Sequence, residues 1–127
     1  MGRWLPSTGM SARLLNNELQ RSAPVFSALG DETRLRLVAR LSGGAPLSIS
    51  QLADGEAITR QAITKHLRVL ATAGLVEDMR QGRERHWKLR ADQLFEARRC
   101  LDLISRQWDQ ALLRLKAAIE SADPPEE

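Results

Sequence analysis

The clearest structural pattern of the chain lies between Thr59 and Arg90. It opens with TRQAITKHLRVL (Thr59–Leu70), continues past Gly74, and ends around MRQGRERHW (Met79–Trp87). These segments predict a helix followed by a basic hairpin, or wing. The stretch contains eight Lys or Arg and three Asp or Glu residues, a net charge of +5, whereas the whole chain of 127 residues carries +3. The positive charge is therefore concentrated here, which favours a polyanionic partner.

A shorter helix is predicted directly before this stretch. The cluster Gly43–Pro46 breaks the chain, Ser48 starts a helix that ends near Gly55, and a turn leads to Thr59. The Thr59 hydroxyl can cap the first turn of the next helix. Two short helices joined by a tight turn are the sequence form of a helix-turn-helix.

The second of these helices, at about residues 59–73, has an apolar and a polar side. At about 100° per residue, one continuous arc holds Ala62, Ile63, Leu67, Val69, Leu70 and Ala73. The opposite face holds Gln61, Thr64, Lys65, Arg68 and Thr72. No acid interrupts that face, and its side chains are of the kinds that read base edges or bind phosphates. The alternative is a merely solvated face, since every amphipathic helix has a polar side.

Two other residues of this helix occupy special positions. His66 invites a role as a metal ligand or pH sensor, but it falls inside the apolar arc. That position favours a partly buried histidine whose ring nitrogens form hydrogen bonds with neighbouring residues. Arg60 lies beside the free backbone amides of the first turn, so it is better placed for a phosphate than for a base.

The wing is predicted at about residues 75–90. A two-residue turn at Gln81-Gly82 would set Val76 opposite Trp87 and Asp78 opposite Arg85, an apolar pair and a charge pair. Gln-Gly is a weaker turn signal than Asn-Gly, so a register that differs by one residue stays open.

The long cationic side chains of Arg80 and Arg83 flank the tip of this hairpin, where they can reach a DNA backbone or a minor groove. The alternative is a solvated tip without a partner. Helix and wing together give these predicted DNA contacts: Thr59, Arg60, Gln61, Thr64, Lys65, Arg68, Arg80, Arg83 and Arg85.

The last helix is predicted from Ala91 to Ser121, a segment without Gly or Pro. Its heptad stripe consists of Leu94, Ala97, Leu101, Ile104, Trp108, Ala111, Leu115 and Ala118. Such a helix is about 45 Å long, more than a domain of this size can cover. Part of the stripe should pair with a second chain; the alternative is packing wholly against the first helices of its own chain. The predicted dimer contacts are Leu15, Leu19, Leu94, Leu101, Ile104, Trp108 and Leu115.

The N-terminal half is predicted to be helical as well. A helix from Ser11 ends before Pro24, and a second helical piece spans Val25–Leu29. Asp31 then caps a helix that continues to Leu41. In this helix we expect core positions at Leu35, Val38, Ala39 and Leu41, and solvated positions at Arg34, Arg36 and Arg40.

The composition, 43% hydrophobic and 28% charged, is globular. No apolar run approaches the roughly 18 residues of a membrane span, and the N-terminus has no signal-peptide pattern. We expect one cytoplasmic domain at residues 11–121 between flexible tails at 1–10 and 122–127. The single cysteine, Cys100, cannot form an internal disulfide and is expected to be a small buried hydrophobe, the alternative being a redox or metal role.

Four segments together resemble the ArsR family of bacterial winged-helix repressors: Ala28–Leu37, Thr64–Leu70, Gly74–Val76 and Gly82-Arg83. The resemblance covers nearly everything from Ser22 to Ser121. It implies a mainly α fold with a small β-hairpin, a winged helix-turn-helix with a long terminal dimerisation helix. It also implies a homodimer, formed by the first and last helices, on a near-palindromic double-stranded DNA operator. The family's reading positions correspond to Gln61, Thr64 and Lys65.

The metal-binding motifs of the family's sensors are missing. The helix from Ser48 has no Cys-x-Cys pair, and no histidine follows His86, so the last helix lacks the imidazole ligands of zinc-type sites. We therefore expect no metal and no cofactor. The chain is more similar to metal-free members whose last helix carries a tryptophan, as Trp108 does here, and its effector is not indicated.

These features predict a sequence-specific, DNA-binding transcriptional regulator, a homodimeric repressor. The alternative is a winged-helix protein-interaction module whose last helix pairs with another protein. An enzyme is the weakest interpretation, because the sequence shows no Ser/His/Asp or Cys/His set, no paired carboxylates in a cleft pattern and no phosphate-cradling glycine loop.

Overall fold

The computed structural model describes residues 12–122, which fall into two compact units. The larger unit is Ser22–Ala97; the smaller one combines the described residues up to Arg21 with those from Arg98 onward. The predicted tail at 1–10 and nearly all of that at 122–127 lie outside the described residues. The single domain expected at residues 11–121 stays a prediction.

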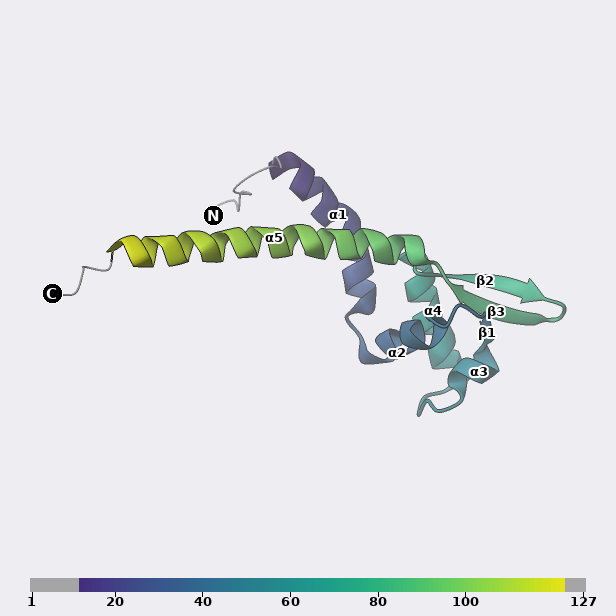
Figure 1. The fold of residues 1–127 in the computed structure, drawn as a ribbon. Helices are drawn as coiled ribbons and strands as arrows, with labels where there is room; N and C mark the ends of the chain where they lie inside the picture. Colours follow the sequence, from purple (N-terminus) through teal and green to yellow (C-terminus); the bar gives the residue numbers. More distant parts are fainter. Residues whose placement is uncertain (1–11, 123–127) are drawn as a thin grey trace. The chain divides into compact units, whose positions relative to one another are not determined.

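The predicted fold class is confirmed: the chain is mainly helical with a small antiparallel sheet (Figure 1). In chain order the elements are α1 (Ala12–Leu29), α2 (Glu32–Leu41), β1 (Leu47–Ser48), α3 (Ile49–Ala53), α4 (Arg60–Thr72), β2 (Val76–Gln81), β3 (Glu84–Leu89) and α5 (Ala91–Ala122). Among the helices within residues 12–122, none combines the length and apolar character needed to cross a membrane.

The first helix is continuous through Pro24, so the prediction that it ends there is wrong. Proline has no N–H and gives up one hydrogen bond to the preceding turn. On both sides of it, however, Ser22, Val25 and Ala28 are each at most 3% exposed. Their shared burial on one face favours an unbroken helix over a break at the proline.

The second helix begins where it was predicted, because the Asp31 carboxylate accepts a hydrogen bond from the backbone N–H of Arg34 at 3.0 Å. Its buried face was only partly predicted. Leu37 is buried beside Val38 and Leu41, whereas Leu35 is half exposed.

The orientation of α2 follows from Arg34, which was expected to be solvated. Its guanidinium is partly buried and donates to the backbone carbonyl of Ala28 and to Nδ1 of His66. Turning Arg34 inward brings Leu37 into the core and leaves Ala39 exposed, against the prediction.

Helix α3 is held at both ends. At its start, Ser48 and Gln51 form a reciprocal capping box, with Ser48 Oγ accepting from the Gln51 N–H and Gln51 Oε1 accepting from the Ser48 N–H. At its end, the Arg40 guanidinium donates to the carbonyl oxygens of Gln51, Leu52 and Asp54 at 2.7–3.0 Å. Arg40 is exposed, as expected, and through these hydrogen bonds it also fixes the first helix of the helix-turn-helix on α2.

The core of the larger unit fixes α4. Three residues of α4 are completely buried, Ile63, Leu67 and Leu70, and they pack in one cluster with Leu52 of α3 and Trp87 of β3. A side chain on the opposite side of α4 is therefore directed to solvent.

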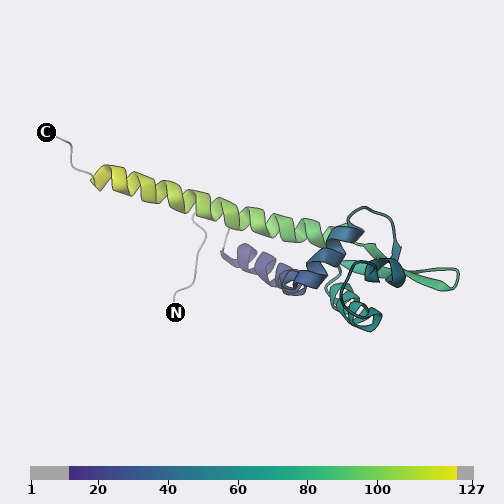
Figure 2. The same cartoon turned by 90° about the horizontal axis from the view of Figure 1, so that it is seen from below.

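The wing is a hairpin of β2 and β3 that projects from the larger unit (Figure 2). Its predicted register is wrong: Asp78 lies opposite Trp87, and the two-residue turn is Gly82-Arg83. Gly82 has φ +63° and Arg83 a negative φ, as in a type II′ turn, whose first central residue is glycine. The turn thus lies one residue later than expected.

The third strand, β1, was not predicted. Leu47 pairs with Trp87 and Ser48 with His86, so the sheet order is β1-β3-β2. Two residues are too few to show a period-two pattern in the sequence. Since β1 leads directly into α3, this pairing joins the base of the wing to the helix-turn-helix.

The last helix is confirmed as one unbroken element of 32 residues, Ala91–Ala122. In the smaller unit, Cys100 is 1% exposed, as expected for a small buried residue, and Leu15 is 2% exposed. Most of the helix that follows is exposed, including large apolar side chains at Leu101, Trp108, Leu112, Leu113, Leu115 and Ile119.

Candidate nucleic-acid interface

The exposed face of α4 is polar and cationic. Arg60, Gln61, Lys65 and Arg68 are all exposed. Thr59 ends the preceding loop, and its Oγ1 accepts from the N–H of Ala62 at 3.0 Å, which confirms the predicted cap. Helix α4 contains no Asp or Glu, so no acid on the helix competes for a bound phosphate.

The two threonine hydroxyls on this face already donate hydrogen bonds to backbone carbonyls of α4. Thr64 Oγ1 donates to the carbonyl of Arg60, and Thr72 Oγ1 to that of Arg68, both at 3.0 Å. Their lone pairs remain available to accept hydrogen bonds. In a major groove, Thr64 would therefore accept from an amino group of adenine or cytosine.

The predicted apolar arc of α4 is correct in its centre and wrong at one edge. Ala62 and Ala73 are half-buried, but Val69 is 43% exposed. The core contacts the narrow stripe that contains Ile63, Leu67 and Leu70, and Val69 faces the gap between α4 and α1 instead.

His66 is partly buried and satisfied, as predicted. Its Nδ1 lies 3.2 Å from the Arg34 guanidinium and 3.8 Å from the Asp31 carboxylate. A guanidinium has only donors, so Nδ1 accepts and the ring proton lies on Nε2. The hydrogen bond from the backbone N–H of Arg34 is the main cause that lowers the pKa of Asp31, and the charge of the Arg34 guanidinium adds to it. This network ties α4 to the start of α2.

Sequence reasoning missed the partners in this network. Arg34 and Asp31 lie 32 and 35 positions before His66 in the chain, and no local pattern links them. The only signal was that His66 interrupts an otherwise apolar arc, which calls for a buried polar partner.

The wing presents three cations near its tip, all exposed. Arg83 lies in the turn, and Arg80 lies directly opposite Arg85 on the neighbouring strand. Like charges placed directly opposite destabilise a hairpin unless something compensates them. Asp78 compensates in part, because its Oδ2 lies 3.3 Å from Arg85 Nε. The predicted contact between Asp78 and Arg85 therefore exists, but diagonally.

Other predicted site residues can also be placed. Among the dimer candidates, Leu101, Trp108 and Leu115 are exposed, whereas Leu15 is buried. Half-buried positions are Leu19, Leu94 and Ile104. Within residues 12–122, no group of three or more His, Cys, Asp or Glu residues is arranged to hold a metal ion.

The sequence and the fold can be compared with those of known proteins. Residues 29–78 match the family described as a helix-turn-helix domain. The solved structure of an ArsR-like transcriptional regulator from Rhodococcus sp. RHA1 is 37% identical, with a TM-score of 0.68, over 86% of this chain and 99% of that one. The chain belongs to the ArsR family. The chain is therefore a DNA-binding transcriptional regulator with a winged helix-turn-helix.

Two curated relatives of this ArsR-family member support that conclusion. The HTH-type transcriptional regulator Rv2034 of Mycobacterium tuberculosis is 38% identical over 96 residues, which cover 76% of this chain and 86% of the relative. The arsenical resistance operon repressor of Escherichia coli is 35% identical over 65 residues, 51% of this chain and 56% of the relative.

Proposed function

We propose that the chain acts as a homodimeric repressor on a near-palindromic operator. Each protomer would place α4 in the major groove and the tip of its wing on the neighbouring backbone or minor groove. The relative from Escherichia coli is named a repressor, which supports this direction of regulation. The role is that of a binding protein without catalysis.

The observation that carries the proposal is the exposed face of α4. Gln61, Lys65 and Arg68 point away from the buried stripe, and no acid on the helix opposes them. Glutamine can bind adenine through two hydrogen bonds, and cations bind phosphates or guanine. The helix thus carries base-reading and phosphate-binding groups on one side.

The homodimer is supported by the exposed apolar residues of α5. Leu101, Trp108 and Leu115 are each more than half exposed and repeat every seven residues. A regular seven-residue repeat is what a left-handed pair of helices needs. Pairing two such helices would cover these side chains and present two copies of α4 to two half-sites, about 34–36 Å apart.

A mobility shift on the DNA upstream of the chain's own gene tests this function. A complex that contains two protomers is expected at low salt, and a shuffled DNA of equal length should bind at least about 1,000-fold more weakly. Equal binding to both DNAs would contradict operator recognition.

A second function is favoured by the same residues of α5. The winged helix would then be a protein-interaction module in which α5 pairs with a different protein. A stable heteromeric complex, together with no mobility shift at low salt, would support this module and contradict the repressor.

A further inference from the structure

The two faces of the wing differ in charge. Side chains alternate between the two faces of a strand, and residues paired across two strands share a face. The arginine face holds Val76, Asp78, Arg80, Arg85, Trp87 and Leu89, and the acidic face holds Glu77, Met79, Gln81, Glu84, His86 and Lys88. With neutral histidine, the formal charge is +1 on the arginine face, from two arginines and one acid, and −1 on the acidic face, from one lysine and two acids.

Arg80 and Arg85 are close neighbours on the arginine face. Gln81 and Glu84 close the two-residue turn Gly82-Arg83, and the pair that closes such a turn is hydrogen-bonded. Hydrogen-bonded and non-hydrogen-bonded pairs alternate along an antiparallel hairpin, so Arg80 and Arg85 form a pair of the second type. In such a pair the Cα atoms are only about 4.5 Å apart. Two guanidinium groups therefore extend from adjacent points of the backbone.

One acid compensates these two arginines, and it does so only in part. Asp78 Oδ2 lies 3.3 Å from Arg85 Nε, and both side chains are about half exposed, at 51% and 50%. Within residues 12–122, no acid forms an ion pair with Arg80. Like charges directly opposite each other destabilise a hairpin. An anion that lies between the two guanidinium groups would remove this repulsion.

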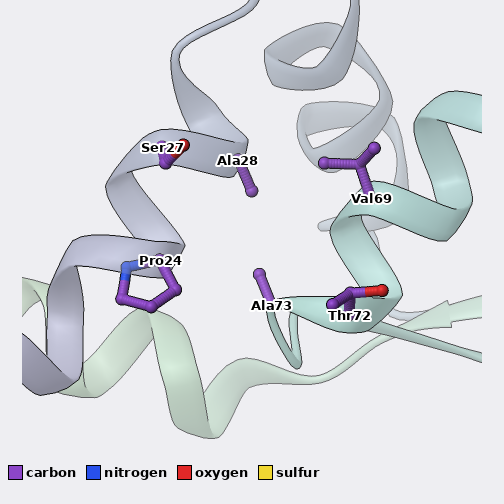
Figure 3. Close-up of a pocket in the computed structure, with 6 residues that line it drawn as sticks. All are labelled: Pro24, Ser27, Ala28, Val69, Thr72 and Ala73. Atoms are coloured by element: carbon purple, nitrogen blue, oxygen red, sulfur yellow. The ribbon is translucent and has the colours of Figure 1, made fainter.

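The apolar depression between α1 and α4 offers no comparable place for an anion. None of its lining residues is charged (Figure 3): they are Pro24, Ser27, Ala28, Val69, Thr72 and Ala73. An anion therefore finds no cation in this depression, whereas the wing offers Arg80 and Arg85.

From this geometry we propose that Arg80 and Arg85 form a clamp for one DNA phosphate, and that Asp78 competes with this phosphate for Arg85. A phosphodiester has two anionic oxygens, and each guanidinium can donate charge-assisted hydrogen bonds to one of them. Asp78 neutralises Arg85 while the wing is free, and it thereby limits the affinity of the wing for DNA. The inference rests on the proposed contact between the wing and the DNA backbone.

The role of Asp78 is tested by removing its charge. In anisotropy titrations, Asp78→Asn should tighten binding to random double-stranded DNA by about threefold or more, because Arg85 becomes fully available to the phosphate. Glu77→Gln is the matched control, because it removes the same charge from the neighbouring residue on the acidic face. This control should change the affinity by less than about twofold. Equal gains from both variants would show that only net charge matters and would overturn the competition.

The clamp itself is tested by removing one cation from each face. Arg80→Ala should weaken binding to all DNA by about fivefold or more at 0.1 M salt, because a phosphate contact is lost. Lys88→Ala removes a cation from the acidic face and should change the affinity by less than about twofold. Both side chains are exposed, so both variants should fold, which circular dichroism checks. Equal losses would contradict the assignment of the arginine face to DNA.

A double variant counts the phosphates that the two arginines bind. In the Asp78→Asn background, Arg80→Ala and Arg85→Ala should together flatten the salt dependence by only about one unit per protomer, because both arginines bind the same phosphate. A combined loss of about two units would assign a separate phosphate to each arginine and overturn the clamp.

Arg83→Ala separates the clamp from the proposed function, because Arg83 lies in the turn and outside the pair. If Arg83→Ala weakens DNA binding while the substitutions of Asp78 and Arg80 act like their controls, the wing contacts DNA but the clamp is refuted. If none of these substitutions changes the affinity, the proposed contact between the wing and DNA is refuted together with the clamp.

Discussion

Helices α4 and α5 both leave a long face uncovered, but the two faces differ in chemistry. On α4 the exposed side chains are polar or cationic, with Lys65 and Arg68 among them. On α5 they include Trp108 and other large apolar residues. Exposed cations are well solvated, whereas a row of exposed apolar side chains marks an interaction surface. This difference agrees with DNA as the partner of α4 and supports the proposal that α5 pairs with a second copy of the chain.

The largest effect is expected from breaking the apolar side of α5. Replacing Leu101 and Trp108 by glutamate puts unpaired carboxylates into the proposed dimer interface. The variant should be monomeric by sedimentation. Loss of paired reading helices should lower operator affinity by about 10²- to 10⁴-fold.

The control for this prediction is Leu113→Glu. Leu113 is 66% exposed but lies about 120° around the helix from Leu101, outside the heptad stripe. This variant should remain dimeric and bind the operator normally. A double variant that stays dimeric would contradict the role given to the stripe.

The next largest effect concerns discrimination by α4. Gln61→Ala should reduce the preference for the operator over an operator with one changed base pair, by about 1–3 kcal/mol, because a bidentate base contact is lost. Affinity for random DNA should change little. Competition titrations measure both values, and equal losses on both DNAs would assign Gln61 to the backbone instead.

The wing offers a matched pair of cations. Arg83→Ala should weaken binding to all DNA sequences and flatten the salt dependence by about one unit per protomer. Arg85→Ala should have a smaller effect, because the guanidinium of Arg85 forms an ion pair with Asp78 at 3.3 Å and is less available to a phosphate. Anisotropy titrations at several salt concentrations compare the two variants; an equal or larger loss for Arg85 would contradict this assignment.

The smallest effect concerns pH and the joint between α2 and α4. The pKa of Asp31 is lowered, so its carboxylate contributes stability above the ordinary value of 3.8, and this contribution is lost as pH falls through the lowered pKa. Asp31→Asn can still cap the helix but does not titrate. When the pH is lowered below about 4, the melting temperature of the Asp31→Asn variant should therefore fall less than that of the unchanged protein. Parallel melting curves would contradict the assignment.

Local patterns predicted most helices of the fold. Asp31, Ser48 and Thr59 identified the starts of α2, α3 and α4, because a capping side chain and the amides it binds are neighbours in sequence. The failures involve contacts between distant segments. The inward turn of Arg34 depends on His66, and β1 exists because Trp87 is available to pair with Leu47.

The candidate site was predicted unevenly for the same reason. The exposed face of α4 follows from helical periodicity, so Gln61, Lys65 and Arg68 lie where they were expected. The register of the wing depends on which two residues form the turn. Gly82 has a positive φ, which suits the first central position of the turn, so the turn is Gly82-Arg83. The exposure of Val69 depends on the distance between α1 and α4, which no pattern within α4 encodes.

The most direct test of DNA binding through the cationic face is the salt dependence of operator affinity. If a dimer contacts about eight phosphates, the dissociation constant should rise about 10⁴-fold between 50 and 200 mM salt, because each contact releases a counterion. A fluorescence anisotropy titration at four salt concentrations across this range gives the slope. A nearly flat response would contradict the assignment of α4 and the wing to DNA.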